Sequence, residues 1–299
     1  MRAIVLASSR LLALLQAMRP AQWIKNGFVL APLFFSGRLT QYEAISQAML
    51  AFAAFCAAAS SVYLINDLQD RRRDSLHTTK RMRPIASGAL PPGAVVATVA
   101  GLVVFALLIG WMAGIGVAVA VGAYLALNFA YSAVLKHIVI VDVFCVAAGF
   151  VLRVQAGAIA VDVPASAWMV LMTFLLAVFL ALGKRRQELK TAERAAEQRP
   201  VLERYTVLLV DELMSVVTPA IAIAYIMYTL DIDTVERFGT SSLYFTAFPV
   251  IFGIFRYLYL VHVRTLGESP TDVALSDWPL IASIAVWIAS FFGIIYLGL

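Results

Sequence analysis

Three side chains that offer oxygen ligands follow one another at four-residue spacing directly after the apolar segment 48–65: Asn66, Asp70 and Asp74. Residues four apart lie on one face of an α-helix, so these three would converge at the end of that segment. Mg²⁺ prefers such oxygen ligands, and proteins usually hold it through one or two carboxylates together with substrate phosphates. The spacing predicts a magnesium site. The alternative is a solvated polar end of an apolar helix.

A strongly basic segment comes shortly after this acidic one. Lys80, Arg81 and Arg83 place three cations within four residues, and the small residues after Pro84 expose backbone N–H groups. Such a loop suits a multiply charged phosphate ligand. An ordinary basic loop on the cytoplasmic side of a membrane protein is the alternative. Acidic residues contribute little to membrane topology, so an acidic and a basic cluster side by side favour a metal and a diphosphate between them.

Further polar residues interrupt or end the apolar segments. Gly149 and Arg153 each fall within about 20° of Asp142 on a helix, and ionisable groups inside a membrane span usually face the bundle interior or a polar cavity. A structural Asp–Arg arrangement or an outward-snorkelling arginine are the alternatives. The other candidates stand at segment ends and are Lys25 and Asn26, Tyr131 and Lys136, and Lys184 and Glu188.

The composition excludes a soluble domain. Hydrophobic residues make up 62% of the 299 residues, charged residues 14%, and the mean hydropathy is +0.87. These values predict an all-α polytopic membrane protein, organised as a single domain over 1–299 with an interfacial amphipathic helix at 1–18. We predict nine apolar segments of bilayer-spanning length, at roughly 26–40, 44–66, 94–112, 115–134, 138–159, 165–183, 213–230, 242–261 and 279–297.

The distribution of charge predicts the orientation in the membrane. Basic residues gather in the N-terminal segment and in the alternate connections 71–83 and 184–204, which the positive-inside rule places in the cytoplasm. The N-terminus is then inside, the C-terminus outside, and the polar clusters face the cytoplasm. The net charge of +5 fits phosphorylated ligands, and nothing indicates a nucleic-acid partner. Cys56 and Cys145 fall within predicted spans and suggest neither a disulfide nor a zinc site.

These motifs resemble the UbiA-type intramembrane prenyltransferase superfamily, whose first signature, NDxxDxxxD, matches residues 66–74. Over nearly its full length the chain is more narrowly similar to the branch of decaprenyl-phosphate phosphoribosyltransferases. The motifs that carry this similarity are RPxQWxKN at 19–26, HxTKRxRPIASG at 77–88, YSxxLKH at 131–137, FVLRxxAG at 150–157 and GKRxxEL at 183–189.

The resemblance implies a nine-helix UbiA-type bundle in a bacterial plasma membrane. It also implies Mg²⁺-dependent transfer of 5-phosphoribose from phosphoribosyl diphosphate to a polyprenyl, decaprenyl-like phosphate, with release of pyrophosphate, to supply a cell-envelope glycan. Prenyltransferases that modify aromatic rings typically carry a second aspartate motif near the sixth span. This chain has Lys184, Arg185, Arg186, Gln187 and Glu188 there instead. One acidic and one cationic motif suit two phosphorylated substrates of which only one needs a metal.

With this reaction, we expect Asn66, Asp70 and Asp74 to hold Mg²⁺ on the donor diphosphate. The predicted catalytic residues are Asp70, Asp74 and Asp142, of which Asp142 would orient a ribose hydroxyl or a cation. The predicted substrate-binding residues share polar character at the ends of spans or within them, and their division between the two substrates stays open. They are Lys25, Asn26, Lys80, Arg81, Arg83, Tyr131, Lys136, Arg153, Lys184 and Glu188.

Two other functions compete with this one. A UbiA-type enzyme could move a prenyl group from a prenyl diphosphate to an aromatic or other small acceptor, and it would share the fold and the first motif. A transporter or lipid flippase is disfavoured because the strong polar clusters all fall on one predicted side of the membrane. The sequence determines neither the prenyl chain length nor the oligomeric state, so a homo-oligomer stays open.

Overall fold

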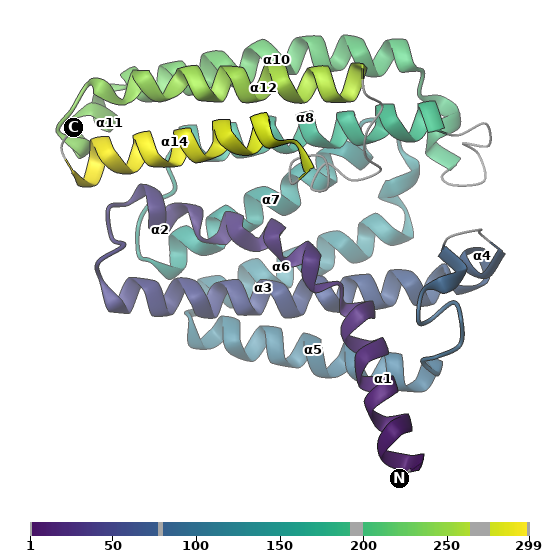
Figure 1. The fold of residues 1–299 in the computed structure, drawn as a ribbon. Coiled ribbons are helices and arrows are strands. Elements are labelled where there is room, and N and C mark those ends of the chain that lie inside the picture. Colours follow the sequence, from purple (N-terminus) through teal and green to yellow (C-terminus); the bar gives the residue numbers. More distant parts are fainter. Residues whose placement is uncertain (1, 77–79, 192–199, 264–275, 298–299) are drawn as a thin grey trace. The chain divides into compact units, whose positions relative to one another are not determined.

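The structure is a computed structural model that describes residues 2–76, 80–191, 200–263 and 276–297 (Figure 1). Throughout these ranges the regular structure is helical, as predicted. Eight helices among the described residues are long and apolar enough to cross a membrane, which makes the chain a multi-pass membrane protein. These helices are α3 (Tyr42–Gln69), α5 (Pro92–Met112), α6 (Ile115–Ala133), α7 (Val141–Ala160), α8 (Ala167–Thr191), α10 (Val207–Leu230), the continuous segment of η5 (Ser242–Thr246) and α12 (Ala247–His262), and α14 (Trp278–Tyr296).

The first of the nine predicted spans is not a single long helix. Residues 26–40 instead contain the end of a 3₁₀-helix, η1 (Pro20–Val29), and a five-residue helix, α2 (Ala31–Phe35). Pro32 cannot donate a backbone hydrogen bond, and Gly37 adopts a left-handed conformation with φ 74° that turns the chain. The other eight predicted segments each match one long helical segment.

The remaining elements precede these helices or connect them. They are α1 (Arg2–Met18), α4 (Arg71–Leu76), η2 (Lys80–Met82), η3 (Leu135–His137), η4 (Pro200–Arg204) and α11 (Ile232–Phe238). The helix α1 covers the predicted N-terminal amphipathic segment; its interfacial role stays a prediction.

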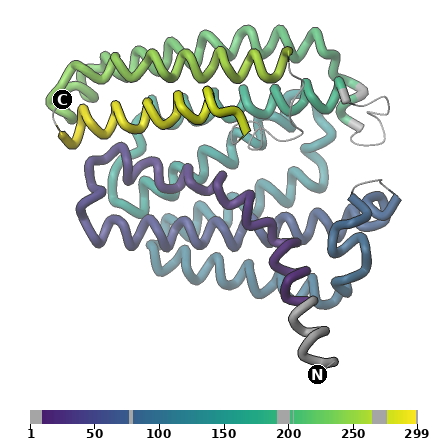
Figure 2. The backbone as a smooth tube through the Cα atoms, viewed as in Figure 1, coloured from purple at the N-terminus to yellow at the C-terminus, as the bar shows by residue number. Residues whose placement is uncertain are grey.

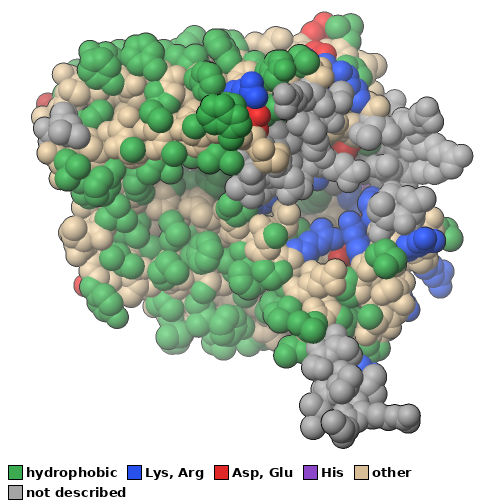
Figure 3. Space-filling view, in the orientation of Figure 1, with side chains coloured by type: hydrophobic (Ala, Val, Ile, Leu, Met, Phe, Trp, Pro, Cys, Tyr) green, Lys and Arg blue, Asp and Glu red, His purple; other side chains and the backbone are tan. Residues whose placement is uncertain are grey.

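The chain divides into two compact units. The first consists of Met1–Ala133 and Leu152–Ala165, and the second of Val134–Val151 and Ser166–Leu299. The helix α7 contributes its second half to the first unit and its first half to the second. A single functional domain over 1–299 stays a prediction. Apolar side chains cover much of the face seen in Figure 3, as lipid contact requires, and Lys and Arg side chains gather on the part of the first unit that carries α4.

Small residues let the helices of the first unit approach one another closely. Ala51, Ala54 and Ala58 of α3 are fully buried beside Phe55, and they pack in one cluster with residues of α5 and α6. Small side chains at helix interfaces are typical of membrane proteins, because association there depends on close packing rather than on exclusion of water. In Figure 1, α3 and α5 run side by side.

The core of the second unit includes large aromatic and aliphatic side chains. The helices α8, α10, α12 and α14 lie next to one another in Figures 1 and 2. Phe179 of α8 and Tyr257 of α12 are both buried, with ring centroids 5.1 Å apart and an interplanar angle of 53°. Tilted aromatic pairs of this kind add to the stabilisation that burial provides.

One close backbone contact positions polar residues within the first unit. A Cβ atom added at Gly157 of α7 would lie 1.9 Å from the carbonyl oxygen of Val29 in η1. Only glycine permits this approach. The contact brings η1, which carries Asn26, against the part of α7 that carries Arg153.

We therefore expect Gly157→Ala to destabilise the protein by about 1–3 kcal/mol or more, because the added methyl group overpacks a backbone contact. Thermal unfolding of detergent-purified protein measures the effect. Gly101→Ala in α5 is the matched control, since a Cβ there meets no heavy atom within 4 Å. Equal melting temperatures for the two variants would contradict the assignment of this contact.

Candidate active site

The predicted metal-binding segment lies at the junction of α3 and α4. Asp70 caps α3 with φ −85° and ψ 1°. The backbone N–H of Asp70 donates to the Asn66 carbonyl at 2.9 Å, and that of Asp74 donates to the Asp70 carbonyl at 2.8 Å. The four-residue helical spacing predicted from the sequence therefore continues through the junction.

The three predicted metal ligands differ in their surroundings. The Asn66 amide oxygen accepts a hydrogen bond of 2.7 Å from the Ser132 hydroxyl on α6. Asp70 is half-buried. Asp74 is buried and accepts a 2.6 Å hydrogen bond from Nη1 of Arg83.

Asp67 is the main residue of this region that the sequence analysis missed. It is buried, and its Oδ1 accepts hydrogen bonds from Nη2 of Arg19 at 2.6 Å and Nη1 of Arg83 at 3.1 Å. The Arg19 guanidinium also lies over the Tyr63 ring, 5.1 Å from its centroid. A seven-residue spacing places Asp67 and Asp74 on one helix face, and this spacing was the signal that could have revealed the pair.

The donor set at the junction fits Mg²⁺. Asn66, Asp70 and Asp74 offer only oxygen ligands, and Mg²⁺ commonly takes one or two carboxylates and completes its shell with water and substrate phosphates. Among the residues that the structure describes, no three His, Cys, Asp or Glu side chains gather closely enough to form an all-protein metal site. The predicted site therefore suits a metal that arrives with a phosphorylated ligand, and it stays a prediction.

The basic loop places its three cations differently. Arg81 is exposed, Lys80 is half-buried in η2, and Arg83 turns back onto the carboxylates of α3 and α4 with 31% of its side chain exposed. His77, the first residue of the predicted loop motif, lies outside the described residues. The loop thus combines one arginine held by carboxylates with one that faces solvent.

Arg153 sits in a buried cage of the first unit. Its Nε donates to the Asn26 amide oxygen at 2.8 Å, and its Nη2 donates to the Tyr124 hydroxyl at 3.0 Å. The guanidinium carbon lies 4.6 Å from the centroid of the Tyr124 ring and 5.9 Å from that of Phe55. Asn26 in turn donates to the Cys56 sulfur at 3.3 Å. The structure brings Asn26 and Arg153 together, and both contact protein groups.

In the second unit, Asp142 is fully buried at the start of α7. Its Oδ2 accepts from Nε of Arg185 at 2.7 Å, and its Oδ1 accepts from the Tyr205 hydroxyl at 2.8 Å. That hydroxyl also accepts a 2.7 Å hydrogen bond from the backbone N–H of Ile140, whose φ of 69° is rare for a β-branched residue. Burial, together with the hydrogen bond to Asp142, raises the pKa of Tyr205, which keeps its hydroxyl protonated as a donor.

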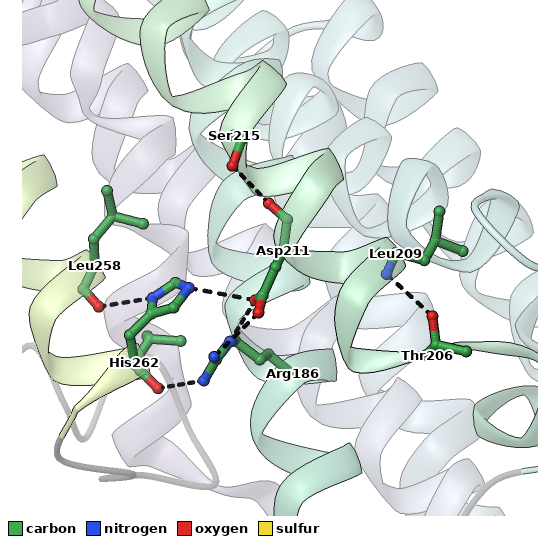
Figure 4. A network of polar contacts seen from close by, with 8 residues as sticks. Arg186, Thr206, Leu209, Asp211, Ser215, Leu258 and His262 are labelled. Atoms are coloured by element: carbon green, nitrogen blue, oxygen red, sulfur yellow. Dashed lines mark hydrogen bonds and ion pairs between the residues drawn. The ribbon is translucent and has the colours of Figure 1, made fainter.

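The cationic motif at the end of α8 is largely used within the protein. Arg185 also donates to Glu188. Arg186 forms a forked pair with Asp211, and His262 Nε2 lies 3.3 Å from the same carboxylate (Figure 4). Lys184 differs from the two arginines: 40% of its side chain is exposed, and its Nζ lies 3.9 Å from Glu188 Oε1, which confirms their predicted shared face.

The remaining predicted residues lie at partly accessible positions. Lys25, Tyr131 and Lys136 are half-buried. A cavity of about 320 Å³ lies near Asn66 within the first unit, lined mainly by apolar side chains of α3, α5 and α6. Its polar lining residues are Ser61, Asn66, Asn128 and Ser132.

This fold and these motifs define a class of membrane-embedded transferases. The family model described as the UbiA prenyltransferase family matches residues 28–269, and the chain belongs to this family. A UbiA homolog from Archaeoglobus fulgidus bound to DMAPP and Mg²⁺ has the same fold, with a TM-score of 0.72 at 19% identity, covering 94% of this chain and 98% of that one.

Two relatives of higher sequence identity share one name. A Mycolicibacterium smegmatis protein named decaprenyl-phosphate phosphoribosyltransferase is 35% identical over 294 residues, covering 95% of this chain and 92% of the relative. A Mycobacterium tuberculosis protein of the same name is 36% identical over 282 residues, covering 92% of this chain and 91% of the relative.

The hydrogen bonds of Tyr205 lead to a stability prediction. Tyr205→Phe leaves the buried Asp142 carboxylate and the Ile140 N–H each without one partner, so we expect a loss of about 1–3 kcal/mol in the free energy of unfolding. Denaturant or thermal unfolding in detergent measures it. Tyr42→Phe, at a side chain that is 86% exposed, is the control and should be neutral. If both substitutions leave stability unchanged, this network does not support the second unit.

Proposed function

We propose that this chain transfers the 5-phosphoribosyl group of phosphoribosyl diphosphate to a polyprenyl phosphate and releases pyrophosphate. The observation that carries the proposal is the similarity, over nearly the full length of both chains, to mycobacterial proteins named decaprenyl-phosphate phosphoribosyltransferase. The product, a polyprenylphosphoryl-5-phosphoribose, would supply a cell-envelope glycan.

The reaction balances without a general base. An oxygen of the lipid phosphate, already ionised at neutral pH, forms a bond to C1 of the ribose, while the bond from C1 to the diphosphate breaks and its electron pair leaves with pyrophosphate. Positive charge develops at C1, as in other glycosyl transfers. The tasks left to the protein are to position the two phosphorylated substrates and to stabilise charge.

Residues of the first unit suit the donor. Asn66, Asp70 and Asp74 would hold Mg²⁺, which neutralises charge on the departing diphosphate when it is bound. Arg81 and Arg83 in the basic loop would bind donor phosphates, because a guanidinium can bind phosphate through two parallel hydrogen bonds.

Other polar residues would serve the lipid phosphate or hold the binding residues in place. Lys184 combines positive charge with an exposed side chain, and Lys136, Lys25 and Tyr131 are partly accessible. Asp142 and Arg153 are buried and bound to protein groups, so we assign them the task of orienting their neighbours.

The location of the enzyme follows from the chemistry of the donor. Phosphoribosyl diphosphate carries many charges and does not cross lipid, so the donor site should face the side on which the donor is present, which we propose to be the cytoplasm of a bacterial cell. We propose a plasma-membrane protein with its N-terminus inside and its C-terminus outside, in agreement with the distribution of basic residues. Cysteine accessibility in sealed vesicles tests this orientation.

Asp70→Asn tests the metal assignment. The substitution keeps the size of the side chain but removes a ligand charge, so we expect transfer to fall by at least about a hundredfold. Formation of the lipid product from labelled phosphoribosyl diphosphate measures the rate. Asp162→Asn is the control, because Asp162 is exposed and its φ of 52° is one that asparagine tolerates. Turnover near that of the unaltered protein in Asp70→Asn would rule out the assignment.

Lys184 separates this function from prenyl transfer to a small acceptor. If Lys184 contacts phosphate, Lys184→Ala should reduce transfer strongly, and Lys184→Asp should reduce it further because a carboxylate repels phosphate at short range. Lys190→Ala, an exposed position of the same helix, should leave activity unchanged. Activity of Lys184→Asp that extra Mg²⁺ restores would indicate a second metal site and favour the rival function.

A further inference from the structure

Arg83 occupies a position between two carboxylates of the predicted metal-binding region. Its Nη1 lies 2.6 Å from Asp74 Oδ2 and 3.1 Å from Asp67 Oδ1. Both carboxylate side chains are only 5% exposed, whereas the side chain of Arg83 is 31% exposed. One nitrogen of the Arg83 guanidinium therefore contacts both Asp74, which is a predicted metal ligand, and Asp67, which is not.

We propose that Arg83 is an internal cation that holds Asp74 until the metal and the donor bind together, and that Asp67 is the positioning residue that keeps Arg83 in place. With the metal-bound donor in the site, Asp74 would hold the metal and Arg83 would bind a donor phosphate. The inference rests on the proposed function, because it identifies how the same site discriminates between a bare metal ion and a metal-bound diphosphate.

The charges of this cluster support the exchange. The carboxylates of Asp67 and Asp74 are balanced by the guanidinium groups of Arg19 and Arg83. A metal ion that enters beside Asp74 without the donor must displace the Arg83 guanidinium or lie next to its positive charge, and both disfavour binding of the bare ion. A metal ion that arrives with a multiply charged anion brings Arg83 a new partner, so the two ligands favour each other's binding by the same factor.

The loop that carries Arg83 is anchored while the side chain can reach either partner. The backbone N–H of Arg83 donates to the Lys80 carbonyl at 3.0 Å, and the Arg83 carbonyl accepts from Ser87 at 2.9 Å. Ile85, two residues after Arg83, is fully buried in a cluster with Leu64 of α3. The exchange therefore requires the Arg83 and Asp74 side chains to turn, while the backbone of the loop stays in place.

Binding of Mg²⁺ without donor tests the proposal directly. Calorimetric titration of the detergent-purified full chain should show that Arg83→Gln binds Mg²⁺ about tenfold more tightly than the unaltered protein. At saturating Mg²⁺, the same variant should bind phosphoribosyl diphosphate at least about tenfold more weakly. Arg72→Gln, an exposed arginine of α4, is the control for loss of one positive charge and should change neither affinity.

The exchange predicts that Arg83→Gln changes the two affinities in opposite directions, with tighter binding of Mg²⁺ and weaker binding of the donor. Unchanged, weaker or undetectable Mg²⁺ binding by Arg83→Gln would overturn it, as would unchanged donor binding. Arg83→Lys covers the case in which the glutamine variant does not fold. It keeps the positive charge, so its Mg²⁺ affinity should stay within about threefold of that of the unaltered protein while donor binding weakens, because an ammonium lacks the guanidinium fork. A Mg²⁺ affinity as high as that expected for Arg83→Gln would contradict the role of the charge.

A double-mutant cycle tests Asp67. Without Asp67, Arg83 is left with Asp74 alone, so Asp67→Asn should weaken Mg²⁺ binding about tenfold and raise the donor KM more than it lowers kcat. In the Arg83→Gln background the loss of Mg²⁺ affinity should shrink to about twofold, because Asp67 acts through Arg83. Equal losses in both backgrounds would show that Asp67 acts on its own.

These results are separable from the proposed function. A chain that forms no phosphoribosyl lipid but shows tighter Mg²⁺ binding in Arg83→Gln would contradict the reaction and leave the guanidinium–metal competition standing. Normal product formation by the unaltered chain, together with unchanged Mg²⁺ binding in Arg83→Gln, would support the reaction and contradict the competition between Arg83 and the metal.

Discussion

Pairing of arginine with carboxylate away from water is the interaction on which the polar parts of this membrane protein depend. A buried carboxylate without a partner destabilises a protein, because apolar surroundings do not compensate for the lost hydration of the charge. Asp67 and Asp74 share Arg83 in the first unit, and Asp142 is paired with Arg185 in the second. The Asp142–Arg185 pair joins the start of α7 to the end of α8, and the Arg83 pairs hold the basic loop against α3 and α4.

The use of arginine and lysine follows their different chemistry. Arg153, Arg185 and Arg186 are buried and make directed hydrogen bonds from a planar fork, which suits permanent contacts. Lys184 carries a compact charge on a long aliphatic stem, and 40% of its side chain is exposed, which suits a ligand that binds and leaves. The two arginines of the cationic motif therefore contact other parts of the protein, and Lys184 is the residue of this motif that we propose for contact with substrate.

Local patterns predicted much of the fold and the outline of the site. Hydropathy located eight long helical segments, and four-residue spacing located the Asn66–Asp74 series and the Lys184–Glu188 contact. Proline and glycine broke the segment 26–40, which hydropathy alone does not detect. Asp67 was missed because its partners, Arg19 and Arg83, come from other segments, and Tyr205 was missed because only the folded chain brings it to Asp142. Such long-range pairs leave no periodic signal in a single sequence.

The mass of the lipid product tests the central claim most directly. Membranes that contain this protein, supplied with phosphoribosyl diphosphate, a polyprenyl phosphate and Mg²⁺, should convert the lipid to a species heavier by one phosphoribosyl group, with release of pyrophosphate. Omitting Mg²⁺ should abolish the product. A lipid of unchanged mass, together with transfer of a prenyl group from a prenyl diphosphate to an aromatic acceptor, would contradict the account.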